Sequence, residues 1–388
     1  MDSKSNPVAI VRCTIQRYLS TMCRGIFFAH RKNDVRVCVF FVIVLNKPPV
    51  FFDSFQEMHP LLQGKGKQCL VVCDANTQTH CLPIIRHLLP ENILLFVMQP
   101  GESSKNIETC MAIWNVLHEN HFQKSDVLIA LGGGVVTDSA AFCASVYKRG
   151  IALLLIPTTI MAMCDAAIGG KNGVDFKGVK NILGNFYEPD HILVCPDFLA
   201  SLPQREKING YAEIIKYRIL TGGNISELGT PSFFSDHLSL LIREAALHKT
   251  QITASDPYDK GIRQCLNFGH TIGHALESYS LNTSSPLLHG EAIAAGMIME
   301  AYLSMKKFNL SEKWFNALLS TIHVYYLPVN APQWNELSHY IYHDKKNSGG
   351  QIRMSLMETT TNCAYGVLVS TQEVQLALSY YSQLYLKT

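Results

Sequence analysis

The stretch DVLIALGGGVVTD, residues 126–138, predicts the fold of the N-terminal half of the chain. Its first residues form an apolar run without the alternation of a half-buried strand. Such a run is typical of a strand that is buried on both faces of a parallel sheet. The glycine triplet 132–134 then leads into a helix that is predicted to begin near Asp138. Backbone N–H groups at this kind of turn can bind a pyrophosphate.

The triplet alone is also compatible with an ordinary tight turn. It matches neither the GxGxxG fingerprint nor the P-loop, which requires a following GK[ST]. Its place directly after a strand favours phosphate binding. Asp74, at the end of an earlier apolar run, could accept a ribose hydroxyl as acidic residues do in dinucleotide sites, or could be a plain turn residue.

Further apolar runs predict strands at 67–74, 94–96 and 151–156, and a helix is predicted from the loop at 100–105 to about His121. From about residue 195 the patterns are helical, at 212–220, 238–249 and 292–303. The sequence therefore predicts a Rossmann-like α/β nucleotide domain over 1–200 and an all-α, metal-binding domain over 201–388, with the active-site cleft between them. Residues 1–60 receive no functional assignment, although 37–45 (VCVFFVIVL) read as a buried strand that is too short to cross a membrane.

Composition excludes several classes of protein. Hydrophobic residues make up 47% of the chain and charged residues 16%, which is typical of a globular protein and not of a disordered one. The formal net charge of +2 argues against nucleic-acid binding. The 12 cysteines include no CxxC pair, which favours reduced thiols in a cytoplasmic protein. We expect no membrane attachment, because the apolar run 37–45 is too short to cross a bilayer.

Three histidines lie within NFGHTIGHALESYSLNTSSPLLHGE, residues 267–291. His270 and His274 share one face of a helix, and the turn-like SSP before His289 could fold that residue back onto the same face. Imidazoles in this arrangement, completed by a carboxylate such as Glu213, indicate a zinc-type metal site. The alternatives are solvent-exposed histidines and a surface Glu213–Lys216 pair worth roughly 0.2–0.5 kcal/mol.

Basic residues next to glycines and small apolar residues indicate an anionic substrate. Lys171 and Lys180 flank glycine-containing segments, and Lys148 and Arg149 precede the run at 151–156. Because the net charge is close to zero, these cations imply a focused positive potential and not a diffuse one. Further cations in the C-terminal half are Lys249, Arg263, Lys345 and Lys346.

Between Asp74 and Asn347 the chain resembles the 3-dehydroquinate synthase family within the sugar-phosphate cyclases. The resemblance rests on the order and spacing of PGESSK (100–105), GGGVVTD (132–138), YKRG (147–150), IPTT (156–159), DAAIGGK (165–171), KN (180–181), AEIIK (212–216), NFGHTIGH (267–274), LHGE (288–291) and DKKN (344–347). No single motif would suffice, but together they are specific.

The resemblance implies a carbon–oxygen lyase of the shikimate pathway, which leads to chorismate and the aromatic amino acids. The expected reaction converts 3-deoxy-arabino-heptulosonate 7-phosphate into 3-dehydroquinate and phosphate. Its steps are transient oxidation at C5 by NAD, elimination of phosphate, re-reduction, ring opening and intramolecular aldol closure. The expected cofactors are NAD and Zn²⁺, for which Co²⁺ could substitute, and the expected assembly is a homodimer.

The resemblance also implies roles for individual residues. It gives the metal ligands as Glu213, His270 and His289, and places His274 at the substrate phosphate instead of the metal. The implied NAD contacts are Asp74, Asn76, Glu102, Lys105, Gly133, Gly134, Val135, Asp138, Thr158, Thr159, Lys171, Lys180, Phe198 and Ser201. The implied substrate and catalytic contacts are Asp165, Lys171, Lys180, Asn181, Lys216, Lys249, Arg263, Asn267, His274 and Lys346, with Arg149 supplied by the second subunit.

Three residues depart from the pattern common in the family, namely Thr137, Asn172 and Ser201. Three alternatives stand beside the cyclase: a relative that acts on another sugar phosphate, a metal-dependent polyol dehydrogenase, and a catalytically inactive binding module. Lys249, Arg263 and Asn267 favour a substrate that carries a carboxylate. A polyol dehydrogenase would not need so many cations, and an inactive relative would be expected to have lost some of these residues.

Overall fold

The structure is a computed structural model that describes residues 47–63, 67–177, 179–342 and 351–385. Contacts divide the chain into Met1–Ile43 and Val44–Thr388, and every described residue belongs to the second unit. The strand predicted at 37–45 therefore lies outside the described residues, as do Lys345 and Lys346. No helix among the described residues is long and apolar enough to cross a membrane.

A six-stranded sheet forms the first part of this unit, with the order β1-β8-β5-β4-β2-β3. Every pairing in it is parallel, as the uninterrupted apolar runs predicted. The central strands are almost fully buried because helices cover the sheet. Its strands are β1 (Val50–Phe51), β2 (Cys69–Asp74), β3 (Ile93–Met98), β4 (Val127–Gly132), β5 (Ala152–Pro157) and β8 (His191–Val194).

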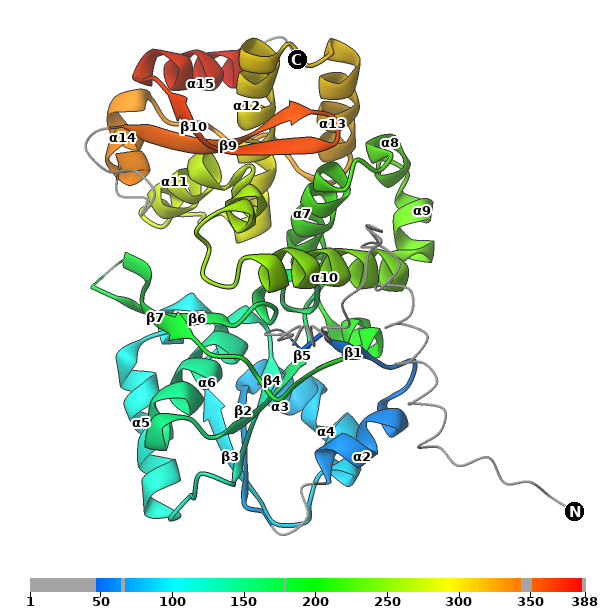
Figure 1. Ribbon diagram of the computed structural model, residues 1–388, viewed down its shortest axis with the longest axis vertical. Coiled ribbons are helices and arrows are strands. Elements are labelled where there is room, and N and C mark those ends of the chain that lie inside the picture. The colour runs from blue at the N-terminus through cyan, green and yellow to red at the C-terminus, as the bar shows by residue number, and fades with distance from the viewer. Residues whose placement is uncertain (1–46, 64–66, 178, 343–350, 386–388) are drawn as a thin grey trace, which may run out of the picture. The chain divides into compact units, whose positions relative to one another are not determined.

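Helices lie on both faces of this sheet. Figure 1 shows α5 (Ile107–Glu119) and α6 (Gly134–Val146) on one side of β2–β4, and α3 (Ala75–His80) and α4 (Leu82–Ile85) on the other. Right-handed crossovers require this distribution, because the chain reverses its direction across the sheet after β3. The short helix α2 (His59–Leu62) follows β1. Helix α6 begins at Gly134, four residues before the predicted start, so the glycine triplet itself caps the helix.

An antiparallel hairpin of β6 (Lys171–Phe176) and β7 (Val179–Phe186) interrupts the α/β pattern, and the sequence did not predict it. Gly173 faces Gly184 across the hairpin. A Cβ atom on either glycine would lie 2.8 Å or less from the facing backbone, so only glycine allows this close approach. The hairpin carries Lys171, Lys180 and Asn181 of the predicted site.

The rest of the chain is mostly helical, which confirms the predicted fold class. The longer helices are α7 (Gln204–Leu220), α10 (Leu238–Ser255), α11 (His270–Ser280), α12 (His289–Phe308), α13 (Glu312–Tyr325), α14 (Trp334–Tyr342) and α15 (Thr371–Tyr385). Short elements are α8 (Ile225–Leu228), α9 (Pro231–Asp236) and the 3-10 segment η8 (Ile262–Asn267). The domain boundary at residue 200 stays a prediction.

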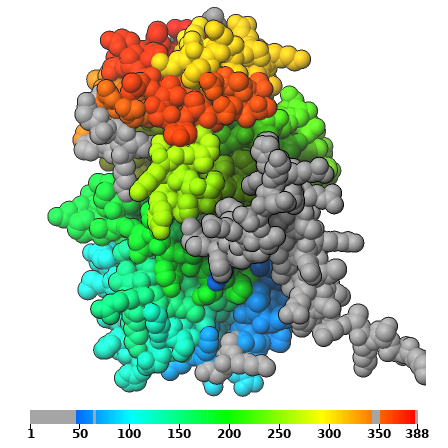
Figure 2. Space-filling model, viewed as in Figure 1, coloured from blue at the N-terminus to red at the C-terminus, as the bar shows by residue number. Residues whose placement is uncertain are grey.

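One antiparallel hairpin departs from the expected all-α character of this part. It consists of β9 (Ile352–Thr359) and β10 (Asn362–Val369). In Figure 2 this orange-red hairpin forms a band of surface across the C-terminal helices. Its inner strand β9 is buried, because Met354, Leu356 and Met357 pack into the core.

Helices α11 and α12 pack closely enough to bring their histidines together. A Cβ on Gly296 of α12 would lie 2.0 Å from the Gly269 carbonyl oxygen, just before α11. The buried Glu300 of α12 accepts hydrogen bonds from the backbone N–H groups of Gly269 (2.6 Å) and Ile272 (3.1 Å). These contacts satisfy N–H groups at the start of α11 and fix it to α12.

Candidate active site

The three predicted histidines meet at the first turns of α11 and α12. His270 is the first residue of α11, His274 lies one turn later, and His289 is the first residue of α12. The nitrogen atoms that they offer all lie within 4.8 Å of one another. The turn at SSP thus returns His289 to the face of His270 and His274, as the sequence predicted.

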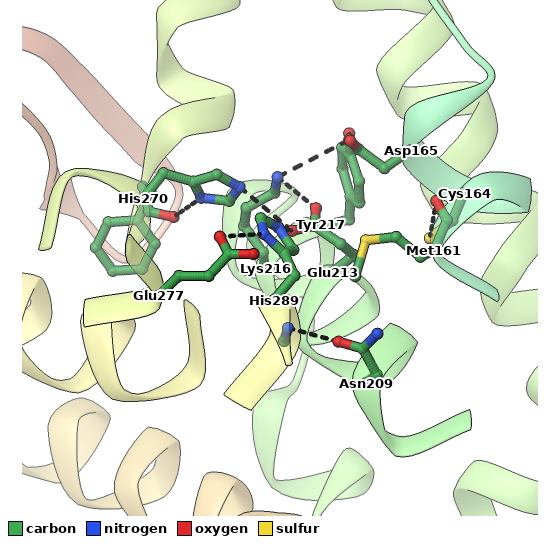
Figure 3. Close-up of polar contacts among 12 residues, drawn as sticks. Met161, Cys164, Asp165, Asn209, Glu213, Lys216, Tyr217, His270, Glu277 and His289 are labelled. Carbon is green, nitrogen blue, oxygen red and sulfur yellow. Dashed lines mark hydrogen bonds and ion pairs between the residues drawn. The ribbon is translucent and has the colours of Figure 1, made fainter. Parts of the chain in front are cut away.

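Glu213 of α7 lies next to two of these histidines. Its Oε1 is 3.4 Å from His270 Nε2 and 3.7 Å from His289 Nε2. Lys216, one turn later on α7, places its Nζ 2.5 Å from Glu213 Oε2. Figure 3 shows these four side chains converging. Because Glu213 and Lys216 are almost fully buried, they are not the surface ion pair considered as an alternative.

In His270 and His289 the other ring nitrogen, Nδ1, already has a hydrogen-bond partner. His270 Nδ1 lies 3.0 Å from the carbonyl oxygen of Phe268, and His289 Nδ1 lies 3.2 Å from Glu277 Oε2. An N–H at Nδ1 in both rings leaves the two Nε2 lone pairs directed at Glu213, which is the tautomer that metal ligands adopt. Both carboxylate oxygens of Glu213 are buried without a hydrogen bond of good geometry to any described residue.

This donor set fits a divalent metal of the zinc type. Two imidazoles and one carboxylate that leave a position open are the ligands of many catalytic zinc sites. The distances connect Glu213 with His270 and His289, which are the three ligands implied by the family resemblance. His274 belongs to the same cluster, as the helical spacing predicted.

The charged groups in this cluster shift one another's pKa values. Burial would raise the pKa of Glu213, but Lys216 and the two histidines hold it well below its usual range. Burial and the neighbouring Lys216 lower the pKa of His270. Burial would also lower the pKa of His289, but Glu277 and Glu213 outweigh it and raise the pKa to about 10.

A group of buried cations surrounds Asp165. The Asp165 Oδ1 atom accepts a hydrogen bond from the Tyr217 hydroxyl at 2.6 Å and lies 2.9 Å from Lys249 Nζ and 3.9 Å from Lys216 Nζ. Lys249 Nζ also donates to the Asp165 carbonyl oxygen at 2.7 Å. Lys216 belongs to both groups, so the predicted anion-binding residues are continuous with the metal-type cluster.

Other predicted substrate residues lie on η8 and on the β6–β7 hairpin. Arg263 is buried and donates to the carbonyl oxygens of Pro257 (2.7 Å) and Gly169 (2.8 Å). Asn267 Nδ2 donates to the Gln264 carbonyl oxygen at 2.9 Å. Lys171 forms an ion pair with Asp259, a residue that the sequence reasoning missed. Its only local signal was its position four residues before Arg263.

Lys180 and Asn181 lie on β7. Lys180 Nζ is 2.8 Å from Glu277 Oε1 on α11 and 3.6 Å from Glu102 Oε1. Asn181 is exposed, adopts the left-handed conformation with φ 51° and donates its backbone N–H to Asp175. Glu277 is the second residue that sequence reasoning missed, although it follows His270 by seven positions and therefore shares its helix face.

The predicted NAD residues gather at the carboxyl ends of the parallel strands. Asp74 ends β2, Gly133 caps α6 after β4, and Thr158 follows β5, so the sheet places all three at one edge. The Asp74 carboxylate accepts the Thr77 N–H at 2.8 Å and so caps helix α3, where the sequence predicted a loop. Gly134 and Val135 open α6, Thr159 follows Thr158, and Asn76 is exposed on α3.

The buried Lys105 forms an ion pair of 2.6 Å with the partly buried Asp138 at this edge. Burial raises the pKa of the Cys81 thiol to about 11. The Ser201 hydroxyl donates to the Phe198 carbonyl oxygen at 3.3 Å. Phe198 is buried against Phe55, with ring centroids 4.6 Å apart.

The remaining predicted residues lie apart from these clusters or beyond the described residues. Arg149 is exposed and has a left-handed backbone with φ 60°. Lys346 lies outside the described residues. Of the departures from the family pattern, Thr137 donates to the Gly133 and Gly134 carbonyl oxygens within its own helix, and Asn172 donates to the Gly170 carbonyl oxygen.

Comparisons with known proteins identify the family. The family model for the N-terminal domain of 3-dehydroquinate synthase matches residues 95–209, and the model for its C-terminal domain matches residues 210–347. A 3-dehydroquinate synthase from Parabacteroides distasonis is 33% identical over 339 residues, which are 85% of this chain and 96% of that protein. The chain belongs to the 3-dehydroquinate synthase family. This confirms the resemblance inferred from the motifs.

Two solved structures of other proteins share the fold of this family member. A 2-deoxy-scyllo-inosose synthase, solved with carbaglucose-6-phosphate, NAD⁺ and Co²⁺, superposes with a TM-score of 0.75 at 22% identity; the match covers 85% of this chain and 96% of that one. ValA, a 2-epi-5-epi-valiolone synthase from Streptomyces hygroscopicus solved with NAD⁺ and Zn²⁺, gives a TM-score of 0.73 at 23% identity, with coverages of 92% and 100%. At these identities the likeness shows the fold alone.

Proposed function

We propose that this chain is a 3-dehydroquinate synthase, which converts 3-deoxy-arabino-heptulosonate 7-phosphate into 3-dehydroquinate and phosphate. The observation that carries the proposal is the continuity of two clusters through Lys216, which pairs with Glu213 at 2.5 Å and lies 3.9 Å from Asp165. One cluster has metal ligands, and the other has cations that suit a phosphorylated sugar acid. Membership of the family supports the same activity.

Glu213, His270 and His289 would hold the metal, and the strand-end edge with Asp74, Gly133 and Thr158 would hold NAD. Two related folds that were solved with NAD⁺ and with Co²⁺ or Zn²⁺ support this assignment. Bound together, the two groups would supply a Lewis acid and a hydride acceptor for the transient oxidation of a substrate hydroxyl.

The chain's own residues bind and orient the substrate. Lys249 and Lys216 present ammonium groups from a buried site in which electrostatic attraction is stronger than in water. Arg263 is fixed by two backbone carbonyl groups, so its guanidinium is already oriented before a carboxylate arrives. Asp165 holds Lys249 in place. His274, which belongs to the metal-type cluster, would move a proton near the substrate phosphate.

The homodimer belongs to this proposal. Arg149 is exposed at the end of the 3-10 segment Tyr147–Arg149, just after α6, and would be available to the site of a second subunit. All nine cysteines among the described residues are free, and eight of them are buried, which supports a reducing compartment such as the cytoplasm.

The experiment that tests the proposal is phosphate release from 3-deoxy-arabino-heptulosonate 7-phosphate by zinc-loaded protein with catalytic amounts of NAD. We expect release that depends on NAD, stops when a chelator removes the metal, and leaves no net NADH. Steady NADH production from a polyol without phosphate release would instead indicate a dehydrogenase. Turnover of sedoheptulose 7-phosphate alone would indicate another cyclase.

A matched pair of lysine variants links the activity to the buried cations. Lys249→Gln is expected to lower kcat/KM by about 100-fold or more, since it removes a preorganised charge from a buried site. Lys124→Gln changes an exposed lysine and should leave kcat/KM unchanged. Equal kcat/KM values for the two variants would contradict the assignment of Lys249 to the substrate site.

A further inference from the structure

Glu277 is a buried carboxylate that contacts both halves of the site. It lies on α11, and only 6% of the residue is exposed. Its Oε2 faces His289 Nδ1 at 3.2 Å, and its Oε1 accepts a hydrogen bond from Lys180 Nζ at 2.8 Å. The two oxygens of one carboxylate therefore serve a histidine of the metal-type cluster and a lysine of the β6–β7 hairpin (Figure 3 shows the histidine contact).

We infer that Glu277 is a positioning residue, which orients His289 for metal binding and ties the substrate-binding β6–β7 hairpin to the metal centre. The inference rests on the proposed function, because it takes His289 as a metal ligand. It goes beyond that function by assigning a role to a residue that is neither a proposed metal ligand nor a proposed substrate contact.

Glu277 Oε2 lies next to the His289 ring. This imidazole is the first side chain of α12 and is 28% exposed, so the helix itself does not fix its rotation or its tautomer. A carboxylate at Nδ1 selects the form with the proton on Nδ1 and directs the Nε2 lone pair towards Glu213, 3.7 Å away. The Phe268 carbonyl group orients the His270 ring in the same way. This hydrogen bond is weaker than the one from Glu277, because the carbonyl group carries no charge.

Glu277 Oε1 contacts the β6–β7 hairpin through Lys180. Its strand β7 is largely exposed, so few apolar contacts hold it in place. The Lys180–Glu277 bond joins residues 97 positions apart and connects the hairpin to α11. The Glu102 carboxylate also lies near Lys180, at 3.6 Å, but its side chain is 39% exposed, whereas the Glu277 side chain is 9% exposed. The buried partner is the stronger anchor, since an exposed ion pair is screened by water.

The test measures metal binding directly. Metal-free protein is titrated with Zn²⁺ in competition with a chromophoric chelator, and with Co²⁺ while its visible absorption is recorded. Glu277→Gln keeps the size of the side chain but removes the charge, and we expect it to weaken Zn²⁺ binding by about 10–100-fold. The Co²⁺ spectrum should change in intensity, because the geometry of the His289 ligand changes.

The matched control is Glu291→Gln. Glu291 lies two residues after His289. It pairs with Arg205 at 2.9 Å and accepts a hydrogen bond from the backbone N–H of Leu288. Glutamine preserves its cap on α12, so the Zn²⁺ dissociation constant should stay within about twofold of the parent value. Glu277→Asp retains the charge on a shorter side chain and should fall between the parent and Glu277→Gln.

The anchoring of the hairpin by Glu277 is tested separately, by amide hydrogen exchange. Lys180→Gln leaves Glu277 free for His289, so Zn²⁺ affinity should stay close to the parent value, while amide hydrogen exchange in 171–186 should speed up. Glu277→Gln should change both quantities. Exchange in the hairpin that is unaffected by either variant would overturn the anchoring role.

The outcomes separate this inference from the proposed function. If the parent binds Zn²⁺ and Glu277→Gln binds it equally tightly with the same Co²⁺ spectrum, the positioning role is wrong and the proposed function stands. If the parent protein itself does not bind Zn²⁺, the metal centre is wrong, and both proposals fail. Should Glu277→Gln not fold by circular dichroism, Glu277→Asp decides the question, and parental affinity in that variant together with an unchanged spectrum would overturn the role.

Discussion

At the scale of single residues, the site depends on buried charges that hold one another. Asp165 is the clearest case, because Lys249, Lys216 and the Tyr217 hydroxyl all lie around its Oδ1 atom. Burial would raise the pKa of Asp165, but the two lysines outweigh it and lower the pKa from 3.8 to about 2. A carboxyl group with a depressed pKa in the folded state stabilises the fold above its unfolded pKa.

This shift predicts how stability depends on pH. The contribution of Asp165, about 2 kcal/mol at 1.36 kcal/mol per pKa unit, should be present above about pH 4 and disappear as the pH falls towards 2. Asp165→Asn should remove this part of the acid dependence. It should also cost about 3–5 kcal/mol at neutral pH, because it leaves buried lysines unpaired.

The measurement is urea unfolding of the parent and of Asp165→Asn at a series of acidic pH values. Asp236→Asn, on the exposed end of α9, is the control and should show the parent's pH dependence. An unchanged acid slope in Asp165→Asn would show that the lysines do not hold this carboxylate in the ionised state.

At the scale of elements, the packing of α11 against α12 sets the distance between His270 and His289. The contact depends on glycine: a Cβ on Gly296 would meet the Gly269 carbonyl oxygen at 2.0 Å and the Gly273 nitrogen at 2.7 Å. These are backbone atoms that cannot rotate away. Any side chain at Gly296 must therefore move one helix relative to the other, and with it the histidines.

Gly296→Ala is accordingly expected to affect stability and metal binding together. We expect a loss of at least about 2 kcal/mol in the free energy of unfolding, as for overpacked cores, together with weaker Zn²⁺ binding. Gly366→Ala is the control: its Cβ meets nothing within 4 Å, although a φ of +66° should cost about 1 kcal/mol. Urea unfolding and chelator competition measure both effects. Parental Zn²⁺ affinity in Gly296→Ala would contradict this account.

At the scale of the molecule described by the structure, the metal-type cluster joins three helices that are distant in sequence. Glu213 comes from α7, His270 from α11 and His289 from α12. A ligand that binds only the folded state stabilises it by mass action. An ion bound by all three helices should therefore increase the free energy of unfolding of the helical part.

Zinc is thus expected to raise the thermal stability of the metal-free protein. At a free concentration about 100-fold above its dissociation constant, the gain should be about 2.7 kcal/mol, or a melting temperature higher by a few degrees. Mg²⁺ at the same concentration should give no comparable gain, because imidazole nitrogens are poor ligands for it. Glu213→Gln should abolish the zinc effect. Differential scanning fluorimetry measures all three, and equal shifts with both ions would contradict a site built from histidines.

The elements that could be predicted from the amino-acid sequence are those with local signals. Uninterrupted apolar runs gave the parallel strands β2, β4 and β5, because strands buried on both faces need apolar residues at every position. The glycine triplet marked the strand-to-helix turn, and helical spacing placed His270 and His274 on one face. The β6–β7 hairpin escaped prediction because its second strand is largely exposed and carries glycine, lysine and asparagine instead of an apolar alternation.

Which of these local features meet depends on how the helices and strands pack in the folded protein. The carboxylate of Glu213 approaches His270 and His289 because α7 packs against α12, and no periodicity in the sequence encodes that contact. The two contacts of Glu277, with His289 and with Lys180, depend in the same way on segments that are distant along the chain. Backbone propensity and apolar periodicity act over a few residues. The partners of a buried charge are chosen by packing across the whole fold, where an unpaired charge would be too costly to keep.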